Sequence, residues 1–279
     1  MGRYPPPIVQ PARGSLPVLL SIPHSGSDYE ATVLANAVGG RRALELLEDP
    51  LVDRLAWRAI GAGFGAVIQP VPRAMIDCNR DEEELDPAAI AGIGPVPVGP
   101  RARHGLGLIP SRTHRDGALW RRPIDRAELA RRIEQVHRPY HQALADGVEA
   151  LKARHDEVLL LDCHSMPSRR QVWADVVIGN RHGTSAAEWI SNEALRIVRG
   201  AGLKAVLNDP YAGGAIVARH GQPGEGVHAL QLEIDRSLYL DRDSRRAGRG
   251  FDRIALLLEA LATSLGKALL DGQLRVAAE

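Results

Sequence analysis

Two histidines each follow an apolar run that is typical of a buried strand. Residues 16–22 lead into Pro23-His24-Ser25-Gly26, and residues 157–161 lead into Asp162-Cys163-His164-Ser165. Parallel sheets bind ligands just beyond the carboxyl ends of their strands, and imidazole is a common zinc ligand. This pattern predicts a metal shared by His24 and His164, although each histidine could instead cap its strand by hydrogen bonding.

A carboxylate interrupts a third apolar pattern. Glu233 stands in the alternating segment 228–234, between Leu232 and Ile234. Burying a carboxylate costs free energy unless the group has a partner or a task. Glu233 is therefore either the partner of an ion pair, for example with Arg236, or a general base, and the strand pattern leaves both open.

The neighbours of His164 are assigned from strand alternation. Asp162 precedes His164 by two residues, so in an extended strand both point to the same side, and Asp162 either orients the imidazole ring or caps the strand end. Cys163 points to the opposite side and is predicted to be a small buried hydrophobe. His137 and His141 share a helix face, but with Pro139 between them packing is favoured over metal binding.

Strand and helix patterns alternate along the chain, which predicts one α/β domain over residues 1–279 with a central mixed, mostly parallel sheet flanked by helices. Residues 1–15 are expected to form an extended segment. The expected strands are residues 16–22, 66–69, 157–161, 172–178, 205–207 and 228–234. The expected helices are residues 41–48, 51–61, 126–155 and 185–198, with one or two more over residues 242–270.

Proline, glycine and aspartate mark several boundaries. Asp125 is a plausible N-cap for the helix 126–155, Pro139 should kink or divide that helix near residues 140–141, and Gly272 is a natural stop for the last helix. Residues 86–115 are rich in glycine and proline. A loop of this length is expected to cover a site or to be mobile.

Composition excludes several classes of protein. The chain has 279 residues, a hydrophobic content of 44% and a net charge of +1, which gives no electrostatic case for binding nucleic acid or a membrane surface. Two cysteines, Cys78 and Cys163, cannot make a disulfide framework. No apolar run approaches the roughly 18 residues of a membrane helix, and the first fifteen residues do not resemble a signal peptide. A cytoplasmic location is expected.

Several segments taken together resemble the N-formylglutamate amidohydrolase family and, more distantly, the zinc carboxypeptidases. The resemblance spans nearly the whole chain. It is carried by Ile22-Pro-His-Ser-Gly26, Ile76-Asp-Cys-Asn-Arg80, Asp162-Cys-His-Ser-Met-Pro167, Gly179-Asn-Arg-His-Gly-Thr-Ser185, Asn208-x-x-Tyr-x-Gly-Gly214 and Glu233-Ile-Asp-Arg-Ser-Leu-Tyr239.

The resemblance implies a zinc-carboxypeptidase-like fold and a Zn²⁺-dependent hydrolase that removes a small acyl group from an amino-acid nitrogen. The implied substrate is N-formyl-L-glutamate or a related acidic molecule. Asn79 and Arg80 match residues that grip a substrate carboxylate in carboxypeptidases. Arg73 is a further candidate, for the carboxylate or for the oxyanion. Tyr211 and Gly213 are additional substrate-binding candidates.

The third metal ligand must come from elsewhere in the chain, because carboxypeptidases use a His-x-x-Glu pair and position 27 is serine here. Asp49, at the helix break before Pro50, is the favoured carboxylate, with Asp28, Glu30 and Asp53 as alternatives. Two histidines and a carboxylate leave one zinc position for water, whose pKa the metal brings to about 7. Glu233 would take the proton.

Other functions remain open at this stage. The enzyme could act on another acyl amino acid or a peptidoglycan fragment, since the arginine-rich region 101–122 could select a different acid. A non-catalytic binding module of the same fold is also possible. The sequence does not distinguish a formyl from an acetyl group, and it leaves the metal in vivo and the oligomeric state undetermined.

Overall fold

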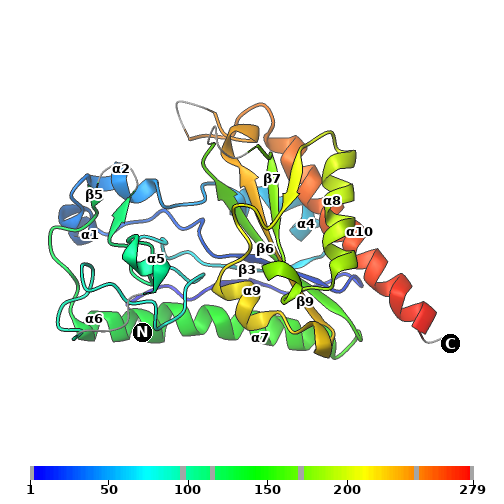
Figure 1. Ribbon diagram of the computed structural model, residues 1–279, viewed down its shortest axis with the longest axis horizontal. Helices are drawn as coiled ribbons and strands as arrows, with labels where there is room; N and C mark the ends of the chain where they lie inside the picture. The colour runs from blue at the N-terminus through cyan, green and yellow to red at the C-terminus, as the bar shows by residue number, and fades with distance from the viewer. Residues whose placement is uncertain (1–2, 95–98, 114–116, 169–172, 242–244, 277–279) are drawn as a thin grey trace. The chain divides into compact units, whose positions relative to one another are not determined.

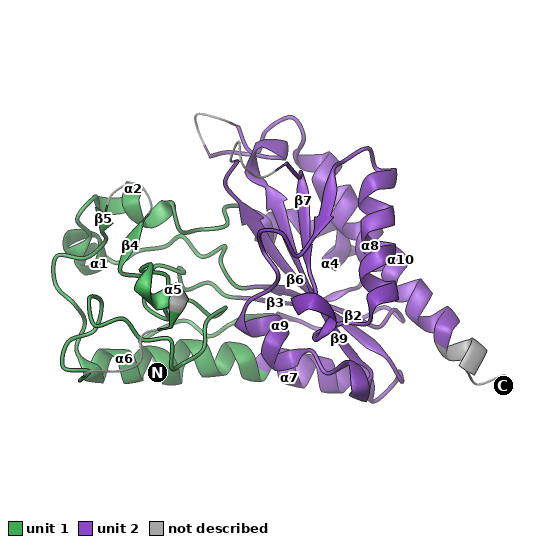
Figure 2. Ribbon diagram, viewed as in Figure 1, with its two compact units in different colours: residues 1–8, 23–50, 69–142 green, residues 9–22, 51–68, 143–279 purple. Residues whose placement is uncertain are grey.

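The chain forms two compact units, which Figure 2 shows in different colours. The computed structural model describes residues 3–94, 99–113, 117–168, 173–241 and 245–276. Unit 1 comprises residues 1–8, 23–50 and 69–142, and unit 2 comprises residues 9–22, 51–68 and 143–279. The chain therefore passes from one unit to the other several times.

Unit 2 is built on a seven-stranded sheet (Figure 1). In spatial order the strands are β1 (Ile8–Gln10), β3 (Gly65–Ile68), β2 (Val18–Ile22), β6 (Val158–Met166), β9 (Val227–Asp235), β7 (Val176–Gly179) and β8 (Ala205–Leu207). The pairs β2–β3, β2–β6, β6–β9 and β7–β8 are parallel, and β7–β9 is antiparallel. The predicted α/β fold with a mixed, mostly parallel sheet is confirmed.

Helices cover both faces of this sheet. One face carries α3 (Val52–Leu55), α4 (Trp57–Gly61), α8 (Glu188–Gly200) and α10 (Phe251–Val276), and the other carries α7 (Arg138–Lys152) and α9 (Ala215–His220). Val18 of β2 packs toward Gly266 of α10, whereas the next residue, Leu19, packs toward Gly147 of α7. The connections hold the 3-10 turns η2 (Arg181–Gly183), η3 (Pro223–Glu225) and η4 (Arg236–Leu238).

Alternation along the central strands separates the core from the polar face. In β6, Leu159, Leu161 and Cys163 belong to the apolar core that includes α10. Asp162 and His164 are therefore left on the opposite face, because successive side chains of a strand point to opposite sides. β9 repeats this pattern, with Leu230, Leu232 and Ile234 in the core. Cys163 is the small buried hydrophobe that the sequence predicts.

Unit 1 contains short elements joined by long loops. They are α1 (Ala31–Asn36), α2 (Gly40–Glu45), α5 (Pro100–Arg103), α6 (Arg126–Arg132), the π-helical turn η1 (Ile133–His137), the start of α7 and the antiparallel pair β4 (Arg112–Thr113) and β5 (Gly117–Ala118). Asp125 caps α6 as predicted, because its side chain accepts a hydrogen bond from the backbone N–H of Glu128.

Two predicted boundaries near the site are wrong. β6 continues to Met166, so His164 lies inside the strand and not beyond its end. The strand continues because its polar side chains find partners, Ser21 for Asp162 and Arg236 for Ser165. The helix 126–155 is divided earlier than expected, at η1, because Pro139 has no N–H and crowds the carbonyl four residues before it.

Other boundaries differ by a few residues. The first predicted helix ends at Glu45, and the second is two short helices, α3 and α4. α10 begins at Phe251 and runs through Gly272, since a single glycine costs only about 1 kcal/mol in a helix. The expected starts of a strand at Val172 and a helix at Arg242 lie outside the described residues, as do residues 95–98 and 114–115 of the long loop.

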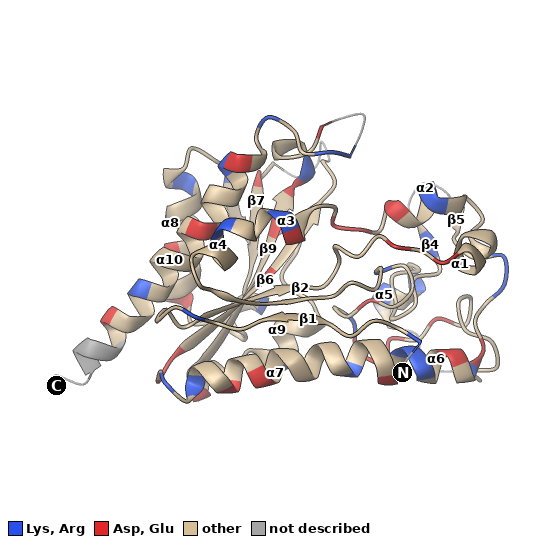
Figure 3. Ribbon diagram, turned by 180° about the vertical axis from the view of Figure 1, so that it is seen from behind, with Lys and Arg blue, Asp and Glu red and all other residues tan. Residues whose placement is uncertain are grey.

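Charged residues of both signs occur on the long helices of the described chain. Basic and acidic residues are interspersed along α7 and α10 (Figure 3), as on ordinary solvated helices. Within the part of the chain that the structure describes, no helix combines the length and apolar character needed to cross a membrane.

Candidate metal and substrate site

His24 lies two residues after β2, and its buried imidazole ring sits between two carboxylates. Nε2 is 2.8 Å from Oδ1 of Asp77, and Nδ1 is 3.1 Å from Oδ2 of Asp49. If Nε2–H donates to Asp77, the lone pair on Nδ1 faces the Asp49 carboxylate. Two lone-pair atoms at this distance require a cation between them, either a proton or a metal ion.

The structure separates the candidate carboxylates. Asp49 is buried, and its backbone N–H donates to the carbonyl of His24 at 2.9 Å. Asp28 and Glu30 are exposed, and Glu30 pairs with Arg3 at 3.3 Å. Among these three, only Asp49 combines burial with contact to His24 through both its backbone and its side chain.

Asp77 is a buried carboxylate with several hydrogen-bond donors around it, and the sequence alone indicated no role for it. It accepts hydrogen bonds from His24, from the backbone N–H of Asn79 at 2.9 Å and from Nε of Arg73 at 2.8 Å. Burial alone would raise the pKa of the Asp77 carboxyl. The charges of Arg73 and Arg80 and the His24 hydrogen bond outweigh burial and hold that pKa well below 3.8. Asp77 is therefore a stable anion.

Arg80 is almost buried and is anchored by two backbone carbonyls. Its Nε donates to Leu106 O at 2.7 Å and its Nη1 to Asn79 O at 2.6 Å, while Nη2 makes no hydrogen bond to any described residue. Its described ion pair is with Asp77, at 3.7 Å, and not with the acidic run 81–84. Nη2 is therefore available to a ligand.

His164 repeats the arrangement found at His24. Its Nε2 is 2.8 Å from Oδ2 of Asp162, and Oδ1 of Asp162 accepts a hydrogen bond from Ser21 Oγ at 2.7 Å. With both carboxylate oxygens engaged, Asp162 fixes the direction of the ring. Nδ1 is then the nitrogen of His164 with the chemistry of a metal ligand. Ser21 had no role in the sequence analysis, although it is the one polar residue of an apolar strand.

Glu233 is the register partner of His164 on the adjacent parallel strand. Its Oε1 accepts a hydrogen bond from Nε2 of Gln231 at 3.0 Å, and both side chains lie on the polar face of the sheet. Arg236 donates to Oγ and O of Ser165, each at 3.2 Å. The pairing of β6 with β9 therefore places Glu233, the predicted base, beside His164, a predicted ligand.

The segment 208–214 approaches the same strand. The backbone N–H of Gly214 donates to Oε1 of Gln231 at 2.9 Å. Gly213 has a φ of +124°, and a Cβ there would lie 2.6 Å from Val217, so only glycine fits. Tyr211 is half-buried and packs against the apolar cluster under this face. The predicted substrate-binding candidates are thus linked to Glu233 through Gln231.

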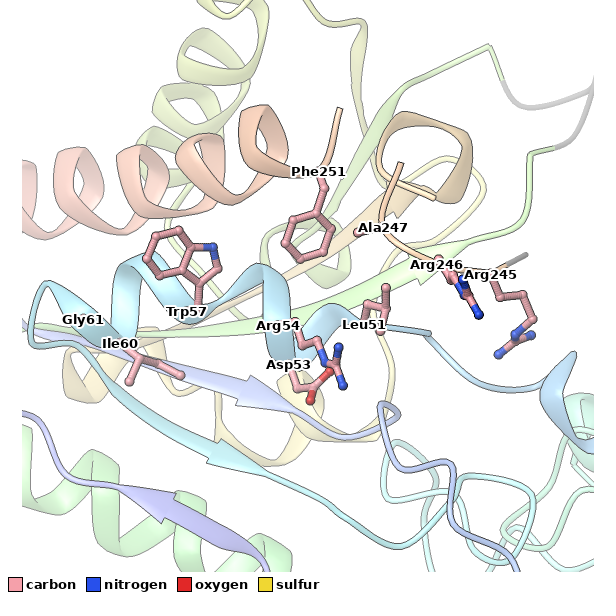
Figure 4. A pocket seen from close by; sticks show the side chains of 10 residues that line it. All are labelled: Leu51, Asp53, Arg54, Trp57, Ile60, Gly61, Arg245, Arg246, Ala247 and Phe251. Atoms are coloured by element: carbon pink, nitrogen blue, oxygen red, sulfur yellow. The ribbon is translucent and has the colours of Figure 1, made fainter. Parts of the chain in front are cut away.

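A groove of about 980 Å³ lies elsewhere on unit 2 (Figure 4) and contains Asp53, the remaining alternative ligand. Its lining is mainly apolar and includes no histidine or cysteine. Burial raises the pKa of Asp53, and Arg54 lies beside it. The groove is lined by Leu51, Asp53, Arg54, Trp57, Ile60, Gly61, Arg245, Arg246, Ala247 and Phe251. It therefore lacks the mixed nitrogen and oxygen ligands of a zinc site.

Comparison with known proteins identifies the family. The family model for N-formylglutamate amidohydrolase matches residues 16–240, which span every motif described above. The chain belongs to the N-formylglutamate amidohydrolase family. The protein is therefore an amidohydrolase, as its sequence motifs predict.

Relatives cover nearly the whole length of this N-formylglutamate amidohydrolase family member. The N-formylglutamate deformylase of Pseudomonas aeruginosa is 30% identical over 85% of this chain and 87% of its own. The one from Pseudomonas putida is 29% identical over 82% and 84%. The crystal structure of N-formylglutamate amidohydrolase from Ralstonia eutropha JMP134 is 32% identical, has a TM-score of 0.87 and covers 96% of this chain and 99% of that one.

Proposed function

We propose that this amidohydrolase removes the formyl group from N-formyl-L-glutamate or a closely related acidic N-acyl amino acid, with a bound zinc ion. The observation that carries the proposal is the register of β6 and β9, which pairs His164 with Glu233. The names of the relatives support the substrate class. The match over residues 16–240 crosses both units, which supports one catalytic domain.

His24, Asp49 and His164 are the proposed metal ligands. β2 and β6 are neighbouring strands that pair Ser21 with Asp162, so His164 is level with the residue just before His24. Consecutive Cα atoms are 3.8 Å apart and neighbouring strands about 4.8 Å apart. The pairing of β2 with β6 and the short Cα spacing therefore support a site to which both histidines contribute.

The donor set fits zinc. Each histidine would present Nδ1, because its Nε2 faces an aspartate that fixes the tautomer, and Asp49 would add a carboxylate oxygen. A zinc ion held there would supply a water whose pKa lies near 7 and would polarise the formyl carbonyl. Three protein ligands leave room for that water, as catalytic zinc sites require.

The chain's own groups perform the remaining steps. Glu233, held by Gln231, takes the proton of the attacking water and returns it to the leaving amine of the amino acid. Arg73 is the proposed group that stabilises negative charge on the carbonyl oxygen. Asn79 and the available Nη2 of Arg80 bind a substrate carboxylate, which Arg80 recognises by charge and planar geometry. Tyr211 and Gly213 line the substrate-binding site.

Replacing the base tests this proposal. Glu233→Gln should lower turnover of N-formyl-L-glutamate by about 10²–10⁴-fold, because the proton acceptor is lost. Zinc content should stay the same, because Glu233 is not a proposed ligand. Turnover, zinc content and melting temperature are measured on the same preparation.

A matched control is Glu157→Gln, which changes a carboxylate 3.4 Å from His228 near the other end of β6 and β9. Its turnover should equal that of the wild type. If Glu233→Gln instead keeps most of its turnover and loses only thermal stability, Glu233 is a structural ion-pair partner and the proposed mechanism is wrong.

A further inference from the structure

Two buried histidines that the proposed reaction does not use contact the backbone around Asn79. Nε2 of His137 is 2.9 Å from the carbonyl oxygen of Arg80, and Nε2 of His141 is 3.0 Å from that of Cys78. A carbonyl oxygen only accepts, so both Nε2 atoms carry hydrogen and cannot ligate a metal. The two rings therefore donate to the carbonyls on either side of Asn79.

The helix geometry brings both rings to one place. His137 ends the π-helical turn Ile133–His137, and its ring centroid lies 4.5 Å from that of His141. The adjacent Arg138 forms a two-bond contact with Glu82, at 3.0 and 2.8 Å. One stretch of helix thus holds residues 78–82 at both ends, and π-helical turns are frequent at functional sites.

We propose that His137 and His141 are positioning residues, which hold residues 78–80 so that Asn79 and Arg80 meet the substrate carboxylate. This rests on the proposed function, because it assumes that these two residues bind substrate. Arg80 Nη1 donates to the carbonyl of Asn79, so the backbone conformation there also sets the direction of the guanidinium. A loss of the histidine donors would let that backbone turn and move Nη2 away from the carboxylate.

The first experiment compares two substitutions of His141. Gln keeps an N–H donor near the position of Nε2, whereas Leu keeps the volume and removes the donor. His141→Leu should raise the KM for N-formyl-L-glutamate roughly 3- to 10-fold, the effect of one hydrogen bond, with kcat little changed. His141→Gln should restore most of the loss. A purely structural role predicts that KM for N-formyl-L-glutamate is unchanged in the folded His141→Leu protein.

The second experiment is a double-mutant cycle with Arg80→Ala. If His141 acts through the carboxylate site, His141→Leu should raise KM by a smaller factor in the Arg80→Ala background than in the wild type, because only Asn79 is then left to be displaced. The diamide of N-formyl-L-glutamate, which has neither carboxylate, should show no effect of His141→Leu on kcat/KM. Additive effects in the cycle, or equal losses with the diamide, would overturn the inference.

The two proposals fail in different ways. If Arg80→Ala alone leaves the KM for N-formyl-L-glutamate unchanged, the proposed carboxylate site is wrong. If Arg80→Ala raises that KM but the Leu variants do not, only the role of the histidines is wrong. His137→Leu and His137→Gln make the same comparison at the other carbonyl, and melting temperature and zinc content show which variants are folded.

Discussion

At the scale of single residues, the site uses the same histidine–carboxylate arrangement twice. Asp77 meets Nε2 of His24 and Asp162 meets Nε2 of His164, each at 2.8 Å. Each aspartate also accepts a hydrogen bond from a second side chain, Arg73 for Asp77 and Ser21 for Asp162, which fixes its position. Such a contact sets the tautomer and raises the basicity of the opposite ring nitrogen. In the proposed site, both rings would bind the metal through Nδ1.

Asp77→Asn tests this arrangement at His24. The amide can still accept a hydrogen bond but carries no charge, so His24 becomes a weaker ligand. Zinc affinity should fall roughly 10- to 100-fold, as is typical for such outer contacts, in a competitive titration with a chelator. Some loss of thermal stability is also expected, because Arg73 and Arg80 lose their anionic partner.

Asp86→Asn is the matched control for that variant. Asp86 is a buried carboxylate of the same unit that accepts hydrogen bonds from Ser111 and from the backbone of Ala88, and none of its hydrogen bonds to described residues involves a histidine. Its zinc affinity should match the wild type. An equal loss in both variants would show that the effect of Asp77→Asn is general destabilisation.

At the scale of elements, the polar groups are positioned by segments that pack closely against one another. An added Cβ at Gly26 would lie 2.3 Å from the carbonyl oxygen of Pro70. Position 26, two residues after His24, therefore requires glycine. On the polar face of the sheet, α9 packs on β6 and β9 and ends at His220. Burial, assisted by Arg219 and opposed by Asp162, lowers the pKa of His220 to about 4.

The end of α9 should therefore make the protein sensitive to acid. The folded chain keeps His220 neutral down to about pH 4, whereas the unfolded chain protonates it near pH 6.5. The contribution of neutral His220 to the free energy of unfolding is complete above pH 6.5 and is lost as the pH falls toward 4. Between pH 6.5 and 5 the loss is at most about 2 kcal/mol, from 1.5 pH units at about 1.36 kcal/mol each.

Urea unfolding at pH 7 and pH 5 measures this contribution. In His220→Gln the decrease in free energy of unfolding between the two pH values should be smaller than in the wild type. His104→Gln, at an exposed histidine, should leave the decrease unchanged. An identical pH dependence in the wild type and His220→Gln would show that His220 is not responsible.

At the scale of the whole molecule, the proposed site draws on segments far apart in the sequence. The proposed ligands His24, Asp49 and His164 stand up to 140 positions apart in the chain. A metal bound by all three would bind the folded chain and not the unfolded one. Metal binding and folding would then be coupled by mass action.

Removal of the metal should therefore lower the melting temperature. At a free zinc concentration about 100 times the dissociation constant, binding contributes about 2.7 kcal/mol, or roughly 5–10 °C for a chain of this size. A chelator should reverse the shift, and differential scanning calorimetry measures both. In His164→Ala, zinc should cause no such shift. A full zinc-induced shift in that variant would exclude His164 as a ligand.

The sequence by itself determined the main strands and helices, apart from their boundaries, and it predicted the candidate site residues. Apolar runs and alternation gave the strands around residues 16–22, 157–161 and 228–234, and polar residues on them marked His24, His164 and Glu233. These signals are local, because strand alternation and apolar runs depend on neighbours a few residues apart. The motifs also predicted the family that the comparisons show.

Only the tertiary structure decided which polar groups meet. Strand register paired His164 with Glu233 and Ser21 with Asp162. The folding of the loops in unit 1 brought Asp77 to His24, and the π-helical turn before Pro139 turned two histidines toward the backbone around Asn79. These contacts join residues about 50 to 140 positions apart. They depend on long-range packing, which no local pattern in the sequence encodes.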